Sequence, residues 1–141
     1  MKIHIVNGPN LNLVGRREPE IYGNQSLEDY FETLEAHYLE DELHYFQSNH
    51  EGALLDYLHE HGFSEGGIIL NAGALTHTSL ALGDAIKGIE APVVEVHISN
   101  VYEREKIRHH SFLEQGCVHT IVGQGLEGYA QAIEFLRTYQ G

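Results

Sequence analysis

The chain contains one cysteine, Cys117, in 141 residues. A single thiol cannot form an intramolecular disulfide, and no second thiol is present to share a zinc site. Disulfide-stapled folds and thiolate zinc sites are therefore excluded. The hydrophobic content of 42% and charged content of 21% are ordinary for a globular domain. At this length one domain can bury a full core, and we expect residues 1–141 to form it.

Long apolar runs are also missing. The N-terminal run Met1–Val6 is too short for a signal peptide, and no stretch approaches the length that spans a membrane. We therefore expect a cytoplasmic protein without a membrane partner.

Positive charge is scarce, because 8 Lys and Arg face 21 Asp and Glu, a formal net charge of −13. Such a surface repels nucleic acid and anionic membranes, so neither is an expected partner. It also repels an anionic metabolite unless the binding site concentrates positive charge. Five of the eight basic residues fall in two short segments, at Arg16, Arg17, Arg104, Lys106 and Arg108. Chance or a local anion site accounts for this clustering.

Strand-like and helix-like segments alternate along the chain. Short apolar or alternating runs predict buried parallel strands at 2–6, 43–47, 67–70, 93–98 and 117–122. Apolar residues at helical spacing predict a helix that begins after Ser26, a favourable N-cap. Further helical patterns cover 54–61, 82–89 and 126–136, and the weakest pattern, around 103–115, is compatible with a broken helix.

This alternation predicts an α/β fold, in which a parallel sheet is covered by helices on both faces. Five strands favour the flavodoxin-like order 2-1-3-4-5. In such sheets ligands bind beyond the carboxyl ends of the strands, near the switch between strands 1 and 3. The side chains expected there are amides, hydroxyls, imidazoles and guanidiniums. Amides and hydroxyls suit a polyol, and guanidiniums suit a carboxylate.

Two other ligands of this fold class do not fit these strand ends. A phosphoacceptor receiver domain needs aspartates after strands 1 and 3, where this chain has Asn7 and Asn71. A flavin mononucleotide site needs a hydroxyl-rich phosphate loop, and residues 7–13 contain one glycine and no hydroxyl. No P-loop pattern occurs. We therefore expect no cofactor.

A metal site is not expected either, although the chain has 11 histidines. His59 and His61 point apart on a helix, because they are two residues apart. His77 and His97 can approach each other, but no acidic pair is placed to complete a ligand set.

His97 lies two residues after Glu95, so both face the same side of a strand. A carboxylate beside an imidazole fixes its orientation and favours its protonated form, which suits a general acid. The alternative is a histidine with a purely structural role at a strand end.

Residues 15–24 contain glycines and a proline and predict a polar loop able to close over the site. Within it Tyr22 lies five residues from Arg17. A phenol ionises near pH 10, and an adjacent arginine favours the phenolate; a shift of about three units corresponds to about 4 kcal/mol. Tyr22 is thus a candidate base, or else an exposed loop tyrosine.

The chain has only three lysines, Lys2, Lys87 and Lys106. The first two are predicted away from the carboxyl ends of the strands. Lys106 has no apolar neighbours to lower the pKa of an amine, as imine chemistry requires. We therefore expect no Schiff base.

Six segments together resemble one family: NGPNLNL at 7–13, REPEIYG at 17–23, QSNHEG at 47–52, NAGALTHTS at 71–79, EVHISN at 95–100 and REKIRHHS at 104–111. They are collinear with the type II 3-dehydroquinate dehydratases and cover essentially the whole chain. The resemblance implies a cofactor-free lyase that converts 3-dehydroquinate to 3-dehydroshikimate by anti elimination of water through an enolate. It also implies a place in aromatic amino-acid biosynthesis or in quinate degradation.

The resemblance implies roles for named residues. Tyr22 matches the base, with Arg17 promoting its phenolate, and Asn12 matches an amide that helps hold the enolate. His97 matches the general acid, oriented by Glu95.

Binding roles follow from the same resemblance. Residues that match those gripping the ring hydroxyls or the carboxylate are Asn71, His77, Arg108, Ile98 and Ser99. The family assembles as a dodecamer, a tetramer of trimers, in which an aspartate matching Asp84 reaches a neighbouring site.

Three positions depart from the family pattern. Ala72 replaces a common proline, Leu75 a frequent aromatic residue and Gly83 a frequent arginine, and none removes a catalytic group. A non-catalytic binding module and a different cofactor-free lyase or isomerase remain as alternatives, which a substrate assay distinguishes.

Overall fold

The computed structural model describes residues 1–16, 20 and 24–141, and its core is a five-stranded sheet. The strands are β1 (Lys2–Asn7), β2 (Glu42–Gln47), β3 (Gly67–Asn71), β4 (Val93–His97) and β5 (His119–Val122). All neighbouring strands are parallel, in the order β2-β1-β3-β4-β5. The predicted flavodoxin-like order is therefore confirmed.

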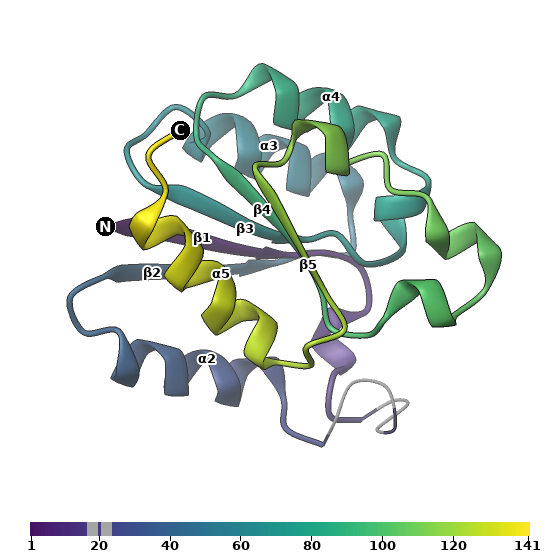
Figure 1. Cartoon of the computed structure of the whole chain (residues 1–141), viewed down its shortest axis with the longest axis horizontal. Coiled ribbons are helices and arrows are strands. Elements are labelled where there is room, and N and C mark those ends of the chain that lie inside the picture. The colour runs from purple at the N-terminus through teal and green to yellow at the C-terminus, as the bar shows by residue number, and fades with distance from the viewer. Residues whose placement is uncertain (17–19, 21–23) are drawn as a thin grey trace.

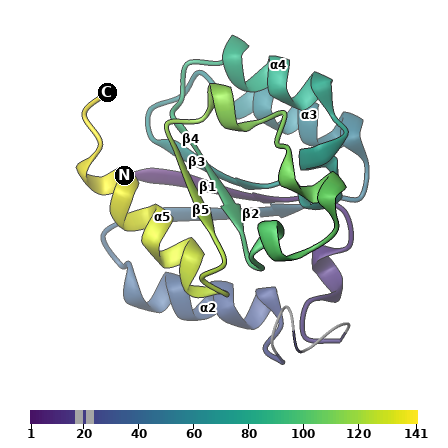
Figure 2. The ribbon, with the colours of Figure 1, turned by 45° about the vertical axis from the view of Figure 1, so that its right-hand side comes forward.

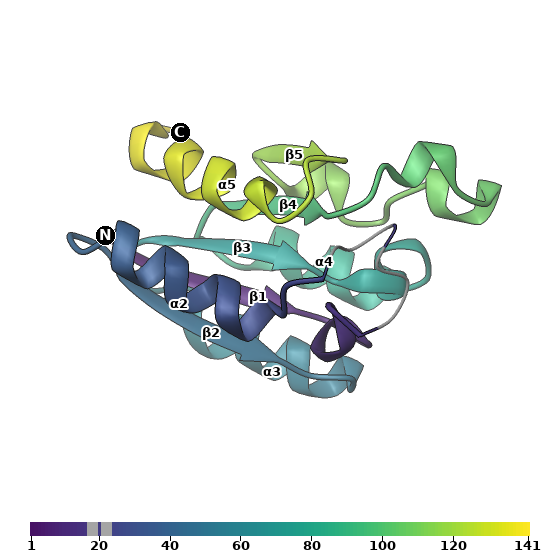
Figure 3. The same cartoon turned by 90° about the horizontal axis from the view of Figure 1, so that it is seen from below.

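Within the described ranges, four α-helices cover the two faces of the sheet (Figures 1 and 2). Helices α3 (Glu51–His61) and α4 (Leu80–Gly88) pack side by side on one face. Helices α2 (Leu27–His37) and α5 (Glu127–Thr138) lie on the other, in front of the sheet in Figure 3. The predicted three-layer architecture is thus present.

The strands are apolar on both faces because both faces are covered. Ile3, Ile5 and Ile69 belong to the core under α2 and α5. Val6 and Leu70 belong to a second core under α3 and α4. This two-sided burial explains why the strands read as short continuous apolar runs.

Helix starts follow local hydrogen bonding. The Ser26 hydroxyl accepts a hydrogen bond from the Asp29 backbone N–H at 3.1 Å, which confirms the predicted N-cap of α2. Ser79 caps α4 in the same way, accepting from Leu82 N–H at 2.9 Å. Helix α3 begins at Glu51, three residues before the predicted start at residue 54. The prediction missed this first turn because it is largely exposed and carries no apolar periodicity.

The segment around 103–115 forms no continuous α-helix. It contains the short 3-10 turns η3 (Val101–Glu103), η4 (Lys106–His109) and η5 (Glu114–Gly116). Turns η3 and η4 lie beyond the carboxyl end of β4, on the right in Figure 1, whereas η5 packs on α4. Across the ranges that the structure describes, no helix combines the length and apolarity needed to cross a membrane.

Candidate active site

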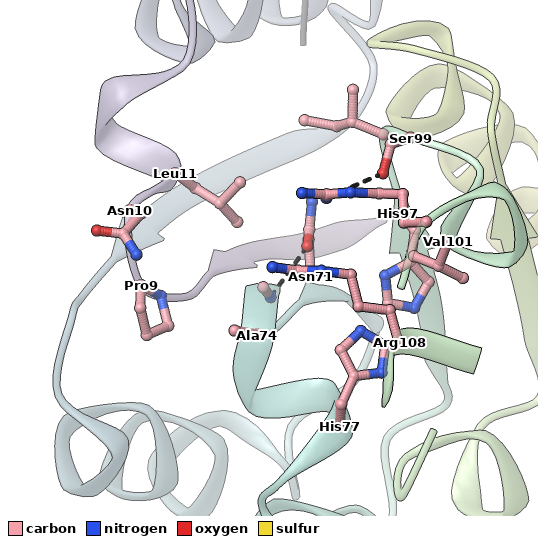
Figure 4. A pocket seen from close by; sticks show the side chains of 13 residues that line it. Pro9, Asn10, Leu11, Asn71, Ala74, His77, His97, Ser99, Val101 and Arg108 are labelled. Carbon is pink, nitrogen blue, oxygen red and sulfur yellow. Dashed lines mark hydrogen bonds between the residues drawn. The ribbon is translucent and has the colours of Figure 1, made fainter. Parts of the chain in front are cut away.

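A pocket opens beyond the carboxyl ends of β1, β3 and β4 (Figure 4). Pro9, Asn10 and Leu11 stand on one side of it, and His77, His97 and Arg108 stand on the other, with Asn71 between them. The rest of the lining comes from Gly73, Ala74, Ile98, Ser99, Val101 and Arg104. The pocket lies where parallel α/β sheets bind ligands.

The ends of β1 and β3 are held together at the floor of the pocket. Asn7 and Asn71 are register partners, and Gly8 N–H donates to the Asn71 carbonyl at 2.8 Å. A Cβ at Gly8 would lie 2.4 Å from the Ala72 carbonyl oxygen, so only glycine permits this approach. The segment that carries Asn10 is thereby held against the segment that carries Asn71.

Glu95 and His97 make the side-chain contact that their spacing predicted, and both side chains are buried. Their side chains are 1% and 6% exposed, and Glu95 Oε2 binds His97 Nε2. The same carboxylate oxygen accepts a hydrogen bond from the Ser111 hydroxyl at 2.8 Å. Thr120 reaches the second oxygen, Oε1, at 3.5 Å. The carboxylate is thus fixed from two sides, and it fixes the imidazole in turn.

His77 stands next to His97, with the two rings stacked and their centroids 6.2 Å apart. Its Nδ1 donates to the carbonyl of His110 at 2.8 Å. Burial lowers the pKa of His77, and the nearby His97 and Arg108 act in the same direction. A neutral His77 with its proton on Nδ1 can offer Nε2 as an acceptor to a ligand hydroxyl.

Two arginines place positive charge at the pocket. Arg108 Nε lies 3.3 Å from Glu105 Oε2, and its side chain is 24% exposed. Arg104, 15% exposed, lies with Nη1 3.5 Å from the Ser99 hydroxyl. A chain of net charge −13 thus gathers two guanidiniums at one cleft, as an anionic ligand requires.

No binding or catalytic role was predicted from the sequence for Arg104 or Ser111. The clustering of basic residues had indicated that Arg104 could belong to an anion site. Ser111 had no local signal, because its contact with Glu95 spans 16 residues.

The amide that lines the pocket after β1 is Asn10 rather than Asn12. Asn12 is exposed in η1 (Leu11–Leu13), where its Oδ1 accepts from Gln47 Nε2 at 3.4 Å. Asn10 has a left-handed backbone, with φ 69°, and its N–H donates to Asn49 Oδ1 at 2.9 Å. A left-handed residue at this position could not be foreseen from spacing along the strand.

Asp84 lies away from this pocket. It is exposed on α4 and borders a different surface groove together with His59 and Phe63. Within one chain the structure therefore does not bring Asp84 to His97. Arg17 and Tyr22 lie outside the described residues.

No metal centre is evident in the part of the chain that the structure describes. No group of three or more His, Cys, Asp or Glu side chains there could hold a metal ion.

Comparison with known proteins gives a consistent result. The family model for "Dehydroquinase class II" matches residues 1–137. A 3-dehydroquinate dehydratase of an Exiguobacterium species is 55% identical over 137 residues, 96% of this chain and 94% of the relative. A catabolic 3-dehydroquinase of Pyricularia oryzae is 50% identical over 138 residues, 95% of this chain and 88% of the relative.

A solved structure agrees with these relatives. The type II dehydroquinase from Butyrivibrio crossotus superimposes with a TM-score of 0.94 at 46% identity, covering 98% of each chain.

Proposed function

Because this chain belongs to the class II dehydroquinase family, we propose that it removes water from 3-dehydroquinate to give 3-dehydroshikimate. The observation that best supports this reaction is the buried Glu95–His97 pair in the wall of a pocket that also holds two arginines. An acid beside a carboxylate-binding site is what elimination from an anionic hydroxy ketone needs. Acid–base catalysis of this kind needs no cofactor.

The reaction proceeds in two proton transfers. A base first removes the proton α to the ketone, and the bonding electrons form an enolate. The enolate then collapses, the carbon–oxygen bond of the β-hydroxyl breaks, and the hydroxyl leaves as water with a proton from an acid. The catalyst ends with base protonated and acid deprotonated, so both must exchange protons before the next turnover.

His97 is the acid in this proposal. Its Nε2 is engaged by Glu95, so a proton passed to a ligand leaves from Nδ1. Glu95 stabilises the protonated ring before transfer and holds it in one orientation. Ser111 holds Glu95, because its hydroxyl donates to the same carboxylate.

Substrate binding uses the rest of the pocket. The backbone N–H groups of Ile98 and Ser99, with the Ser99 hydroxyl, take the carboxylate, next to the Arg104 guanidinium. Arg108, Asn71 and His77 bind the ring hydroxyls. These assignments of residues to the carboxylate and to the ring hydroxyls are supported by the location of all these residues in the pocket lining.

The enolate amide is assigned to Asn10. The family resemblance pointed to Asn12, but of these two exposed asparagines only Asn10 is part of the pocket lining. An amide donor near the developing oxyanion stabilises it by hydrogen bonding.

The base is Tyr22, ionised by Arg17, as the family resemblance implies. An imine mechanism lacks support, since no lysine is found among the described residues that line the pocket. Deprotonation without covalent activation of the ketone requires a strong base, and a phenolate is one. The anti elimination that the family resemblance implies requires Tyr22 to act on the ring face opposite His97.

The assembly is proposed to be a homododecamer, a tetramer of trimers, in the cytoplasm. Asp84 would reach the pocket of a neighbouring subunit, since it faces away from its own. Gly83, where relatives often carry arginine, is close-packed: a Cβ there would lie 2.4 Å from the Phe112 carbonyl oxygen. The pathway role is biosynthesis of aromatic amino acids, with quinate degradation as the alternative; the Pyricularia relative is a catabolic 3-dehydroquinase.

The decisive experiment is an ultraviolet assay for the conjugated enone product with 3-dehydroquinate as substrate. Tyr22→Phe should lose several orders of magnitude in kcat while still binding substrate in calorimetry. Arg17→Ala should move the basic requirement for activity to higher pH. No enone product from the wild-type protein would contradict the proposed reaction.

A borohydride control tests the enolate route. Borohydride added with substrate should leave the wild-type protein active. Inactivation with a mass increase on a lysine would instead indicate an imine-forming enzyme.

A further inference from the structure

A buried tyrosine connects helix α5 to the floor of the pocket. The Tyr129 side chain is 1% exposed, and Asn7 and Asn71 are 0% and 3% exposed. The Tyr129 hydroxyl donates to Asn7 Oδ1 at 2.7 Å and accepts from Asn71 Nδ2 at 3.0 Å. Asn71 Oδ1 in turn accepts from Gly73 N–H at 3.1 Å.

These hydrogen bonds permit only one arrangement of protons. The backbone N–H of Gly73 can only donate, so the Asn71 atom facing it must be the carbonyl oxygen. The Asn71 amide nitrogen then faces Tyr129 and donates to its oxygen. The phenol has one proton, and that proton goes to Asn7. Burial raises the pKa of the Tyr129 phenol, so the group stays a neutral donor.

We infer that Tyr129 is a positioning residue that sets the orientation of the Asn71 amide toward the substrate. Rotation of this amide would break two buried hydrogen bonds, one to Gly73 and one to Tyr129. The Asn71 nitrogen has two hydrogens, and Tyr129 engages one. The other remains for a ligand, so Asn71 presents a donor to a hydroxyl oxygen of the substrate. This inference rests on the proposed function.

A nearby tyrosine provides a matched control. Tyr38 is 6% exposed, and it belongs to the same core as Tyr129. Its hydroxyl donates to Glu134 Oε2 at 2.8 Å, also on α5. Tyr38→Phe therefore removes one phenolic hydrogen bond from the same layer without disturbing Asn71.

The test compares the steady-state kinetics of Tyr129→Phe and Tyr38→Phe with 3-dehydroquinate. Loss of one hydrogen bond that organises substrate binding, about 0.5–1.5 kcal/mol, should raise KM about 2- to 10-fold. The kcat of Tyr129→Phe should stay within about twofold of wild type, because the acid and base are untouched. Tyr38→Phe should change neither constant.

A double variant shows whether Tyr129 acts through Asn71. In an Asn71→Ala background, Tyr129→Phe should raise KM no further, since the amide that it orients is gone. An unchanged KM in the single Tyr129→Phe variant would overturn the inference. So would an equal KM increase in both backgrounds, or an equal effect of Tyr38→Phe.

Two further outcomes are informative. If Tyr129→Phe does not fold, Asn7→Ala releases the phenol proton from its acceptor and should raise KM likewise; an unchanged KM there would overturn the inference. An inactive wild-type protein would contradict the proposed function and this inference with it. An active wild type with an unaffected Tyr129→Phe variant contradicts the inference alone.

Discussion

The chain contains two Glu-x-His pairs on strands, which share a local pattern and a side-chain contact but differ in burial and in their neighbours. Glu42 and His44 stand on β2, at the edge of the sheet, and their Oε2 and Nε2 atoms are in contact. Glu95 and His97 make the same contact on β4, inside the sheet. The side chains of the first pair are 64% and 41% exposed, whereas those of the second are 1% and 6% exposed.

Their neighbours differ as well. Glu42 also lies 3.8 Å from Lys2 Nζ, and His44 stacks on the ring of His4 at 5.0 Å. Glu95 is held by Ser111, and His97 borders the pocket. Water screens the interaction within the exposed pair, so that pair contributes little to stability. In the buried pair, the orientation of His97 depends on the Glu95 carboxylate and on the hydrogen bonds that hold it. The comparison teaches that burial and a place at the pocket, not the Glu-x-His motif, distinguish the pair that we propose for acid catalysis.

The largest contrast should be between His97→Gln and His44→Gln. As the acid for the leaving hydroxyl, His97 should contribute about 10²–10⁴-fold to kcat. The enone assay should show that loss in His97→Gln, with a smaller change in KM. His44→Gln should retain wild-type kcat. Near-normal kcat in His97→Gln would mean that the buried histidine is structural.

A smaller contrast is expected between Glu95→Gln and Glu42→Gln. Hydrogen bonds to charged groups contribute about 1.5–3 kcal/mol, so kcat of Glu95→Gln should fall by about 10- to 100-fold. Glu42→Gln should match the wild type in both kcat and thermal midpoint, because exposed ion pairs are screened. Equal losses in the two variants would show that burial does not distinguish the pairs.

The third prediction concerns His4, on whose ring His44 of the exposed pair stacks. His4 is 3% exposed, and its Nδ1 is hydrogen-bonded to the Tyr57 hydroxyl at 2.7 Å. The pKa of His4 is lowered from 6.5 to about 4, mainly by burial, with the nearby His61 and His44 acting in the same direction and Glu42 opposing them. Below pH 6.5 the unfolded chain binds this proton while the folded protein does not. The stability that His4 contributes is therefore complete above pH 6.5 and lost as pH falls through about 4.

From these two pKa values, His4 should lower the free energy of unfolding by about 2 kcal/mol between pH 7.5 and pH 5. In urea titrations, His4→Leu should gain that amount relative to wild type over the same range. His50→Gln, a change at an exposed histidine, should not. A constant difference between His4→Leu and wild type across pH would contradict the assignment.

Much of the fold was predictable from residue patterns. The predicted bounds of strands and helices agree with the structure within a few residues, because the period of the apolar residues reflects which face of an element is buried. The location of the pocket, beyond the carboxyl ends of the strands, could be predicted because the sheet is parallel. The segment around 103–115 was harder, since 3-10 turns of three or four residues leave no periodic pattern.

The site was predictable in part. Asn71, His77, His97, Ile98, Ser99 and Arg108 do line one pocket. Asn10 was passed over in favour of Asn12, because a left-handed backbone cannot be read from residue spacing. The roles of Tyr22 and Arg17 remain predictions.

The sequence by itself determined the order of strands and helices, the two-sided burial of the sheet and the local contact of Glu95 with His97. All of these depend on periods of two or about 3.6 residues along the chain. Only the tertiary structure decided which of two Glu-x-His pairs is buried and which asparagine faces the pocket. It also brought Tyr129 to Asn7 and Asn71, across 122 and 58 residues. Burial and such distant hydrogen bonds arise when layers pack, and a local pattern carries no record of that packing.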